Sequence, residues 1–210
     1  MNLSQFEKIL SDKIFEIASS GDPAHDFSHF RRVVQSAKNL CFLENARIEV
    51  VMPSAWLHDF VFIPKNDPRR ALASRLSALA AIDFLKEIQY PEIYFKDISN
   101  AIEAHSFSGG IEPLTIEAQV VQDADRLDAL GAIGIARCFA TAGLVKRSFY
   151  SKIDPFCVNR LPDDNQFTID HFYKKLFLVA ETLKTEAGRL EGAKRVLVMK
   201  KYLLDLKNEI

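Results

Sequence analysis

Hydrophobic residues recur every three or four positions along most of the chain, a spacing that places them on one face of an α-helix. The first such stripe lies between residues 3 and 18 and consists of Leu3, Phe6, Leu10, Ile14 and Ile17. Further helices are predicted at about residues 28–40, 47–59, 70–85, 94–105, 115–142, 169–185 and 188–207. Adjacent β-branched residues are also compatible with a short strand at 118–122, although a helix is favoured there. The pattern therefore predicts an all-α fold.

Interruptions of this pattern fall where proline, glycine and polar residues gather. They lie at Asp22-Pro23, at residues 60–69, at Gly109-Gly110 and at residues 146–165, the longest predicted loop. Pro53 lies inside a predicted helix, which it must either begin or kink. Because no repeat, low-complexity tract or linker divides the chain, we expect a single-domain helical bundle over residues 1–210, completed by the helices within 169–207.

Composition narrows the classes of function. The chain has 27 basic and 28 acidic residues, so its net charge of -1 favours neither a nucleic-acid polymer nor an anionic membrane as partner. Three unpatterned cysteines are too few for a disulfide framework and indicate a reducing compartment. The first twenty residues carry several charges, and no later stretch approaches the length of a membrane span. We therefore expect a cytoplasmic location.

Four of the five histidines, His25, His29, His58 and His105, lie at the ends of predicted helices. The pair His58-Asp59 follows an apolar run, where burying both groups without a partner would be costly. A shared divalent cation would remove that cost, and a mixed nitrogen and oxygen ligand set suits Mn²⁺, Fe²⁺, Ni²⁺ or Zn²⁺ better than Ca²⁺. The alternative is an ordinary polar pair at a helix end.

The segment from Asp123 to Asp128 places three carboxylates inside an otherwise apolar helix. Helical spacing allows Asp125 to point inward, with Asp123 and Asp128 supporting it or capping neighbouring groups. An inward carboxylate needs a cation, which a metal would provide. Arg126 would provide it equally well in a structural salt bridge, so this segment alone leaves both interpretations open.

Taken together, these residues resemble a known family. His29-Phe-Arg-Arg-Val33, Leu57-His58-Asp59 and Asp123-Ala-Asp-Arg-Leu-Asp128 are similar in order and context to the H, HD and D signature of the HD superfamily of metal-dependent phosphohydrolases. Further segments resemble the bacterial single-domain subgroup related to the YedJ and YpgQ proteins, and the similarity extends over about residues 5–200. These segments are 22–29, 64–66, 70–78, 104–108 and 123–137.

The resemblance implies an HD-type helical bundle that holds one divalent metal ion. The implied ligands are His29, His58, Asp59 and Asp125, and Asp123 is a supporting candidate behind them. Mn²⁺ is the expected ion, ahead of Mg²⁺, Fe²⁺, Ni²⁺, Co²⁺ and Zn²⁺. The implied reaction is hydrolysis of a phosphoester or phosphoanhydride by metal-activated water.

Other residues are candidates for handling the substrate. Asp59 could accept a proton from the attacking water, and His105 or His25 could act as general acid or bind phosphate. Lys65, Arg70 and Arg126 are the basic residues placed to bind phosphate oxygens, although each could equally be a surface charge. The expected partner is a phosphorylated small molecule of nucleotide type. Neither a nucleic-acid polymer nor a membrane is expected as a partner. The sequence does not decide whether the chain forms a homodimer.

Two other classes of function compete with the enzyme. One is a metal-containing ligand-binding or regulatory protein without turnover, against which the complete set of ligand residues argues. The other is a structural helical module in which His58-Asp59 and Asp125-Arg126 form internal ion pairs. Metal analysis of the purified protein separates the structural module from the other two.

Overall fold

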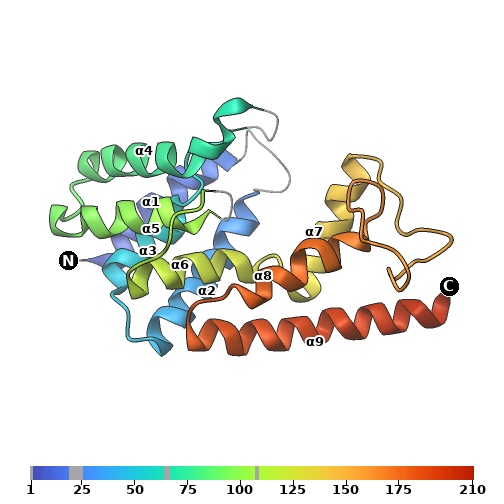
Figure 1. Cartoon of the computed structure of the whole chain (residues 1–210). Coiled ribbons are helices and arrows are strands. Elements are labelled where there is room, and N and C mark those ends of the chain that lie inside the picture. Colours follow the sequence, from blue (N-terminus) through green and yellow to red (C-terminus); the bar gives the residue numbers. More distant parts are fainter. Residues whose placement is uncertain (1, 19–25, 64–66, 107–108) are drawn as a thin grey trace. The chain divides into compact units, whose positions relative to one another are not determined.

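The structure is a computed structural model that describes residues 2–18, 26–63, 67–106 and 109–210 (Figure 1). Within these ranges the chain is helical apart from loops and one isolated bridge between Ser148 and Phe167. The α-helices are α1 (Leu3–Ala18), α2 (Phe27–Leu43), α3 (Ile48–Leu57), α4 (Ala73–Glu87), α5 (Phe95–His105), α6 (Ile116–Leu127), α7 (Gly131–Leu144), α8 (Phe177–Glu181) and α9 (Glu186–Glu209). The all-α prediction is confirmed.

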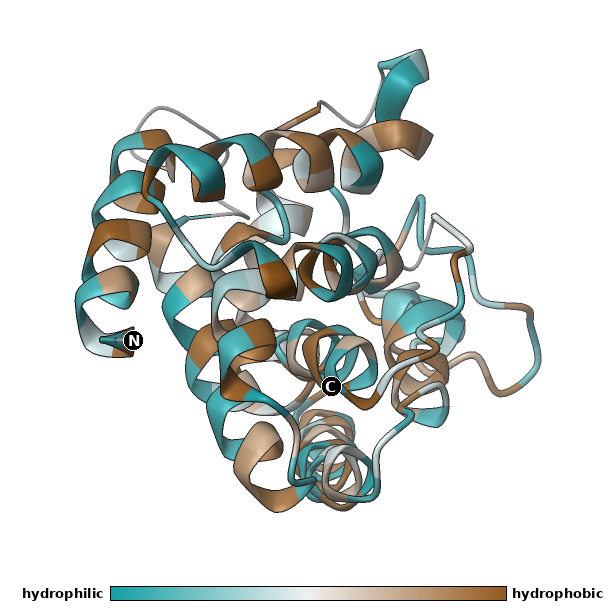
Figure 2. Cartoon of the chain, turned by 90° about the vertical axis from the view of Figure 1, so that its left-hand side faces the viewer, coloured by the Kyte–Doolittle hydropathy of each residue, from teal (hydrophilic) through white to brown (hydrophobic). Residues whose placement is uncertain are grey.

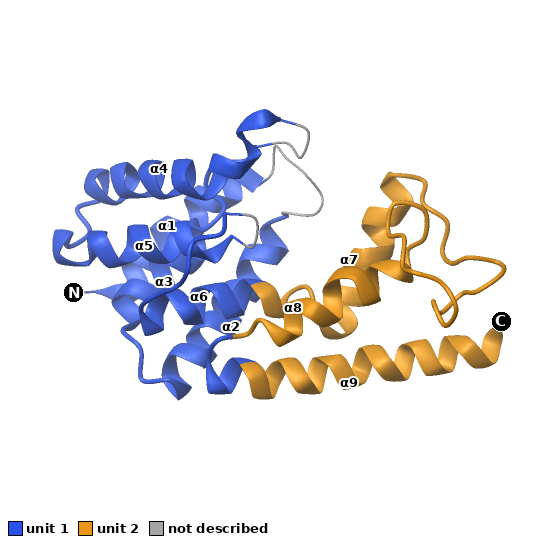
Figure 3. Ribbon diagram, viewed as in Figure 1, with its two compact units in different colours: residues 1–125, 184–188 blue, residues 126–183, 189–210 orange. Residues whose placement is uncertain are grey.

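Two compact units can be distinguished, and Figure 3 colours them separately. Unit 1 contains residues 1–125 and 184–188, and unit 2 contains residues 126–183 and 189–210. The expectation of a single domain over residues 1–210 stays a prediction.

In unit 1, α3 is the central helix. It packs against α1, α2 and α5, and α4 packs against α5. Every residue from Val50 to Leu57 is buried, as its almost uniformly apolar sequence requires. Pro53 inside this helix has no N–H for the carbonyl of Glu49, and the Tyr90 hydroxyl donates to that carbonyl at 2.7 Å instead. The neighbouring helices carry hydrophilic residues on their other faces (Figure 2).

The predicted long helix over residues 115–142 is wrong, because the structure divides it into α6 and α7. Gly131 begins α7 with a φ of 71°, a conformation that side-chain-bearing residues rarely adopt. A Cβ at this position would also lie 3.2 Å from the Cβ of Arg195. Apolar spacing continues through the break, which is why periodicity alone did not reveal it. The run 118–122 is helical, as favoured.

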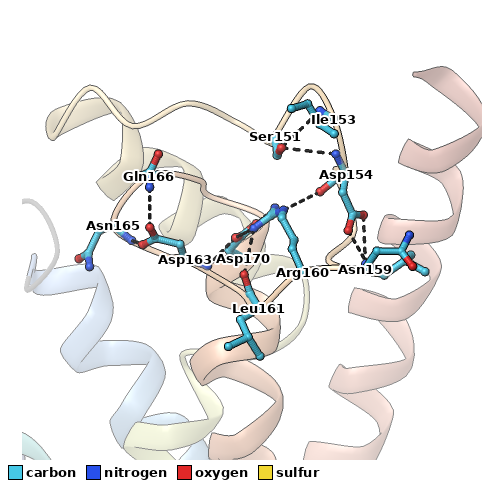
Figure 4. Close-up of polar contacts among 11 residues, drawn as sticks. Ser151, Ile153, Asp154, Asn159, Arg160, Leu161, Asp163, Asn165, Gln166 and Asp170 are labelled. Atoms are coloured by element: carbon cyan, nitrogen blue, oxygen red, sulfur yellow. Dashed lines mark hydrogen bonds and ion pairs between the residues drawn. The ribbon is translucent and has the colours of Figure 1, made fainter.

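In unit 2, residues 146–165 form the long loop that the sequence predicts. The bridge between Ser148 and Phe167 connects its two ends. An ion pair between Arg160 and Asp170 joins its second half to the start of the following helical segment (Figure 4). The predicted helix at 169–185 is shorter, with a π-helical turn at Phe172–Leu176 followed by α8, which ends at Glu181. No single helix in the described ranges is long and apolar enough to cross a membrane, although the broken pair α6 and α7 passes that test when joined.

Candidate metal centre

The first imidazole of the site comes from the start of α2. Asp26 caps this helix, and its carboxylate accepts the backbone N–H of His29 at 2.8 Å. The cap fixes His29 in the first turn, where its side chain is almost completely buried. The start of α2, which the sequence predicts near Ser28, therefore positions the His29 ring.

The second imidazole follows the end of α3. Nδ1 of His58 lies 2.9 Å from the carbonyl oxygen of Ala55, so it carries the hydrogen and leaves the Nε2 lone pair directed away from the helix. The His58 side chain is 0% exposed, and within the described part of the chain its Nε2 has no hydrogen-bond partner. Burial lowers the pKa of His58 to about 4, despite the opposing charges of Asp59 and Asp125. The ring is therefore a neutral nitrogen donor.

Two carboxylates face these nitrogens. Oδ1 of Asp125, on α6, lies 3.6 Å from Nε2 of His29 and 3.9 Å from Nε2 of His58. Oδ2 of Asp59 lies 3.8 Å from Nε2 of His58. These separations are too long for hydrogen bonds. They match two ligands of one ion, because atoms that each lie about 2.1 Å from a cation are about 3 to 4 Å apart.

A third imidazole completes the group. His105 is the last residue of α5, and its Nδ1 lies 2.6 Å from the carbonyl oxygen of Ile102. Its Nε2 lies 3.5 Å from Oδ1 of Asp59. Burial alone would lower the pKa of His105, but its hydrogen bond with Asp59 and the charges of Asp59 and Asp125 raise it above the ordinary value.

The donors fit a divalent cation. His29, His58 and Asp125 form one group with ligand atoms within 4.8 Å of one another, and His58, Asp59 and His105 form a second. Nitrogen and oxygen donors together suit a transition-metal ion. The side chains of Asp59 and Asp125 are 21% and 30% exposed, so a ligand from solvent can reach these two carboxylates. We call these five residues the histidine cluster.

Other predicted site residues have different contacts. The Asp123 carboxylate accepts hydrogen bonds from the backbone N–H groups of Lys184 and Thr185 and from the Thr185 hydroxyl, at 2.7–3.0 Å. These bonds attach residues 184–185 to α6. Arg70 donates from Nη1 to the Ile63 carbonyl at 2.8 Å, and Arg126 donates from Nη1 to the Thr182 carbonyl at 2.8 Å. His25 and Lys65 lie outside the described residues.

Gln122 was not among the site residues predicted from the sequence. This residue is 2% exposed and lies one turn before Asp125 on α6. Its amide donates to the carbonyl of Ala104, next to His105, at 2.6 Å. A polar residue between Val121 and Asp123, on the same helical face as a proposed ligand, was the available signal.

Comparisons with known proteins identify relatives that match most of the chain. Residues 26–130 match the HD domain family. The uncharacterized protein YpgQ of Bacillus subtilis is 30% identical over 208 residues, which cover 97% of this chain and 89% of that protein. A crystal structure of YpgQ in complex with ADP matches with a TM-score of 0.73 over 95% of this chain and 97% of that one. An HD-superfamily hydrolase from Bacillus thuringiensis matches at 27% identity and a TM-score of 0.77, over 98% and 97% of the two chains.

Proposed function

The chain belongs to the HD domain family, and we propose that it is a metal-dependent phosphohydrolase that cleaves a phosphoester or phosphoanhydride of a nucleotide. The observation that supports this proposal best is the histidine cluster. Four separate segments of the chain contribute nitrogen and oxygen donors, in two groups that share His58 and that each have the spacing of ligands around an ion. Hydrolase relatives from the same superfamily support the reaction class.

In this proposal His29, His58, Asp59 and Asp125 hold the cation, with Mn²⁺ as the expected ion. A divalent cation at this position supplies the acidity that makes water a nucleophile near neutral pH and neutralises charge on the phosphoryl oxygens. Hydrogen bonding of Nδ1 to a backbone carbonyl orients His58 and fixes its tautomer. The protein's task is mainly positioning, because phosphoryl transfer requires little covalent chemistry from side chains.

Proton transfer is assigned to Asp59 and to a histidine beside it. Asp59 is partly exposed and could accept a proton from the attacking water through its carboxylate. His105 has its Nδ1 engaged by Ile102, so Nε2 is the atom that would give a proton to the leaving group or bind a phosphate oxygen. His25 is a second candidate for that role, predicted from the sequence alone.

A nucleotide is the proposed substrate because a relative of similar length was crystallised with ADP. Phosphate binding is assigned to Lys65, Arg70 and Arg126. Arg70 uses one N–H to brace the Ile63 carbonyl in the loop after the His58-Asp59 pair, and an arginine has four further N–H groups for phosphate oxygens. A cytoplasmic location is part of the same proposal, since nucleotides and reduced cysteines are both expected there.

The test is a substrate panel run on metal-stripped protein. Nucleoside mono-, di- and triphosphates are each incubated with Mn²⁺, Mg²⁺, Ni²⁺ or Co²⁺, and phosphate and pyrophosphate are measured separately. We expect turnover that requires an added cation and that is absent from the Asp125→Ala variant. Cation binding without turnover on any nucleotide would favour the regulatory alternative, and the absence of cation binding would contradict both.

A further inference from the structure

The last turn of α5 has an unusual set of hydrogen-bond partners. The final carbonyl groups of a helix have no partner within the helix and must find one elsewhere. Here the carbonyl of Ile102 faces Nδ1 of His105, and the carbonyl of Ala104 accepts the side-chain amide of Gln122 from α6. Two side chains thus cap the turn that carries the third imidazole of the histidine cluster.

The hydrogen bond from Gln122 to the Ala104 carbonyl comes with an energetic cost. Within the described residues the Gln122 amide oxygen is buried and has no hydrogen-bond partner. Leaving a buried acceptor unpaired is destabilising, so an aliphatic side chain would suit this apolar position better for stability alone. The benefit of a glutamine here is its N–H donor, directed at Ala104.

The position of Gln122 links two parts of the cluster. It precedes Asp125 by three residues on α6, so both side chains project from one helical face. Its bond to Ala104 therefore fixes the end of α5 against the same face that presents the Asp125 carboxylate. The Ala104 carbonyl thus connects α6 to the neighbouring residue His105, whose Nε2 lies 3.5 Å from Oδ1 of Asp59.

We infer that Gln122 is a positioning residue for the hydrolytic site, which holds His105 in place by fixing the last turn of α5 through the Ala104 carbonyl. This inference rests on the proposed function as far as turnover is concerned. Its structural part, the placement and tautomer of the His105 ring, can be tested without substrate or cation.

The test compares Gln122→Leu with Gln119→Leu. Gln119 is a matched control, because it lies on the same helix and also donates to a backbone carbonyl, that of Pro113 at 3.3 Å, one turn further from Asp125. Long-range ¹H–¹⁵N NMR spectra of the imidazoles, with the His105 signals assigned by His105→Ala, report the tautomer of each ring. In spectra recorded at alkaline pH, where the ring is neutral, we expect His105 to be a single Nδ1–H tautomer in the wild type and in Gln119→Leu. In Gln122→Leu we expect broadened or mixed signals.

A double-mutant cycle provides the second readout. Gln122→Leu should lower kcat/KM about tenfold, the size typical of residues behind a metal site, while Gln119→Leu leaves it within about twofold. In a His105→Ala background, Gln122→Leu should have almost no further effect. An unchanged His105 spectrum, or additive losses in the cycle, would overturn the inference. The proposed function would be contradicted separately, by wild-type protein that binds no cation and turns over no nucleotide.

Discussion

Two buried polar clusters, one in each unit, show why buried charge alone does not identify a functional site. In unit 2, Asp170 is 0% exposed, and its carboxylate accepts bonds from Arg160 and from the backbone N–H of Asp163 (Figure 4). We call these three residues the Asp170 cluster. Its contacts are within hydrogen-bonding distance, so the charges satisfy one another.

The histidine cluster of unit 1 has the opposite character. Four pairs of nitrogen and carboxylate oxygen atoms in this cluster are separated by 3.5–3.9 Å, and only the shortest of them, between His105 and Asp59, approaches a hydrogen bond. Backbone carbonyls hold the rings of His58 and His105 by their Nδ1 atoms, which directs the Nε2 atoms at the carboxylates. Fixed donors at such spacing are typical of a site built for an additional ion, whereas the Asp170 cluster is complete.

The largest effect is expected from removing a proposed ligand. Asp125→Ala and Asp59→Ala should each lower cation affinity by more than about a hundredfold, because even residues behind the ligands change affinity by about 10 to 100-fold. Turnover should be lost together with the ion. Calorimetric titration with Mn²⁺ measures the affinity, and circular dichroism should show an unchanged helical content. A variant with normal affinity would remove its residue from the ligand set.

Breaking the Asp170 cluster should affect stability and leave the cation site intact. Asp170→Ala leaves the Arg160 guanidinium without its carboxylate, and we expect a loss of about 3 kcal/mol, since Arg160 is 24% exposed and partly reached by water. For a chain of this length that lowers the melting temperature by about 6 to 12 °C. Mn²⁺ affinity at 20 °C should equal that of the wild type, because every proposed ligand lies in unit 1. If Asp170→Ala is too unstable to purify, Asp170→Asn is the milder variant for the same comparison.

Adding the ion should stabilise only a protein with an intact histidine cluster. A ligand that binds the folded state alone contributes about 2.7 kcal/mol at a concentration one hundred times its dissociation constant. Thermal unfolding of metal-stripped wild type, with and without Mn²⁺, should show this gain, and a chelator should reverse it. Asp170→Asn should show the same gain. An equal gain in Asp125→Ala would mean that Mn²⁺ acts elsewhere on the chain.

The sequence predicted the fold where a local signal existed. The stripe from Leu3 to Ile17 coincides with α1, because that helix buries one face. The division between α6 and α7 could not be read from periodicity, since apolar spacing continues from Leu127 to Leu130. It occurs at Gly131, whose φ of 71° lies in the left-handed region that favours glycine.

The candidate site was predictable in its residue types but not in its distances. The family resemblance pointed to Asp125 rather than Asp123, and helical geometry agrees, because residues two positions apart project about 200° apart. The partners of Asp123, at Lys184 and Thr185, are 61 and 62 residues away in the sequence. No local pattern could have revealed them. The approach of His105 to Asp59 likewise depends on how α5 packs.

The smallest expected effect is the response of the Asp170 cluster to acid. Burial opposes ionisation of Asp170, but its hydrogen bonds with Arg160 and the backbone of Asp163 lower its pKa below the ordinary value of 3.8. Because the folded-state pKa is the lower one, Asp170 contributes stability above pH 3.8, and that contribution is lost as the pH falls through the depressed pKa. Urea unfolding of metal-free protein at a series of pH values below 5 should therefore show a stability decline that is shallower in Asp170→Asn than in the wild type. Identical declines would mean that the Asp170 carboxylate titrates normally and that the Asp170 cluster is weaker than its geometry indicates.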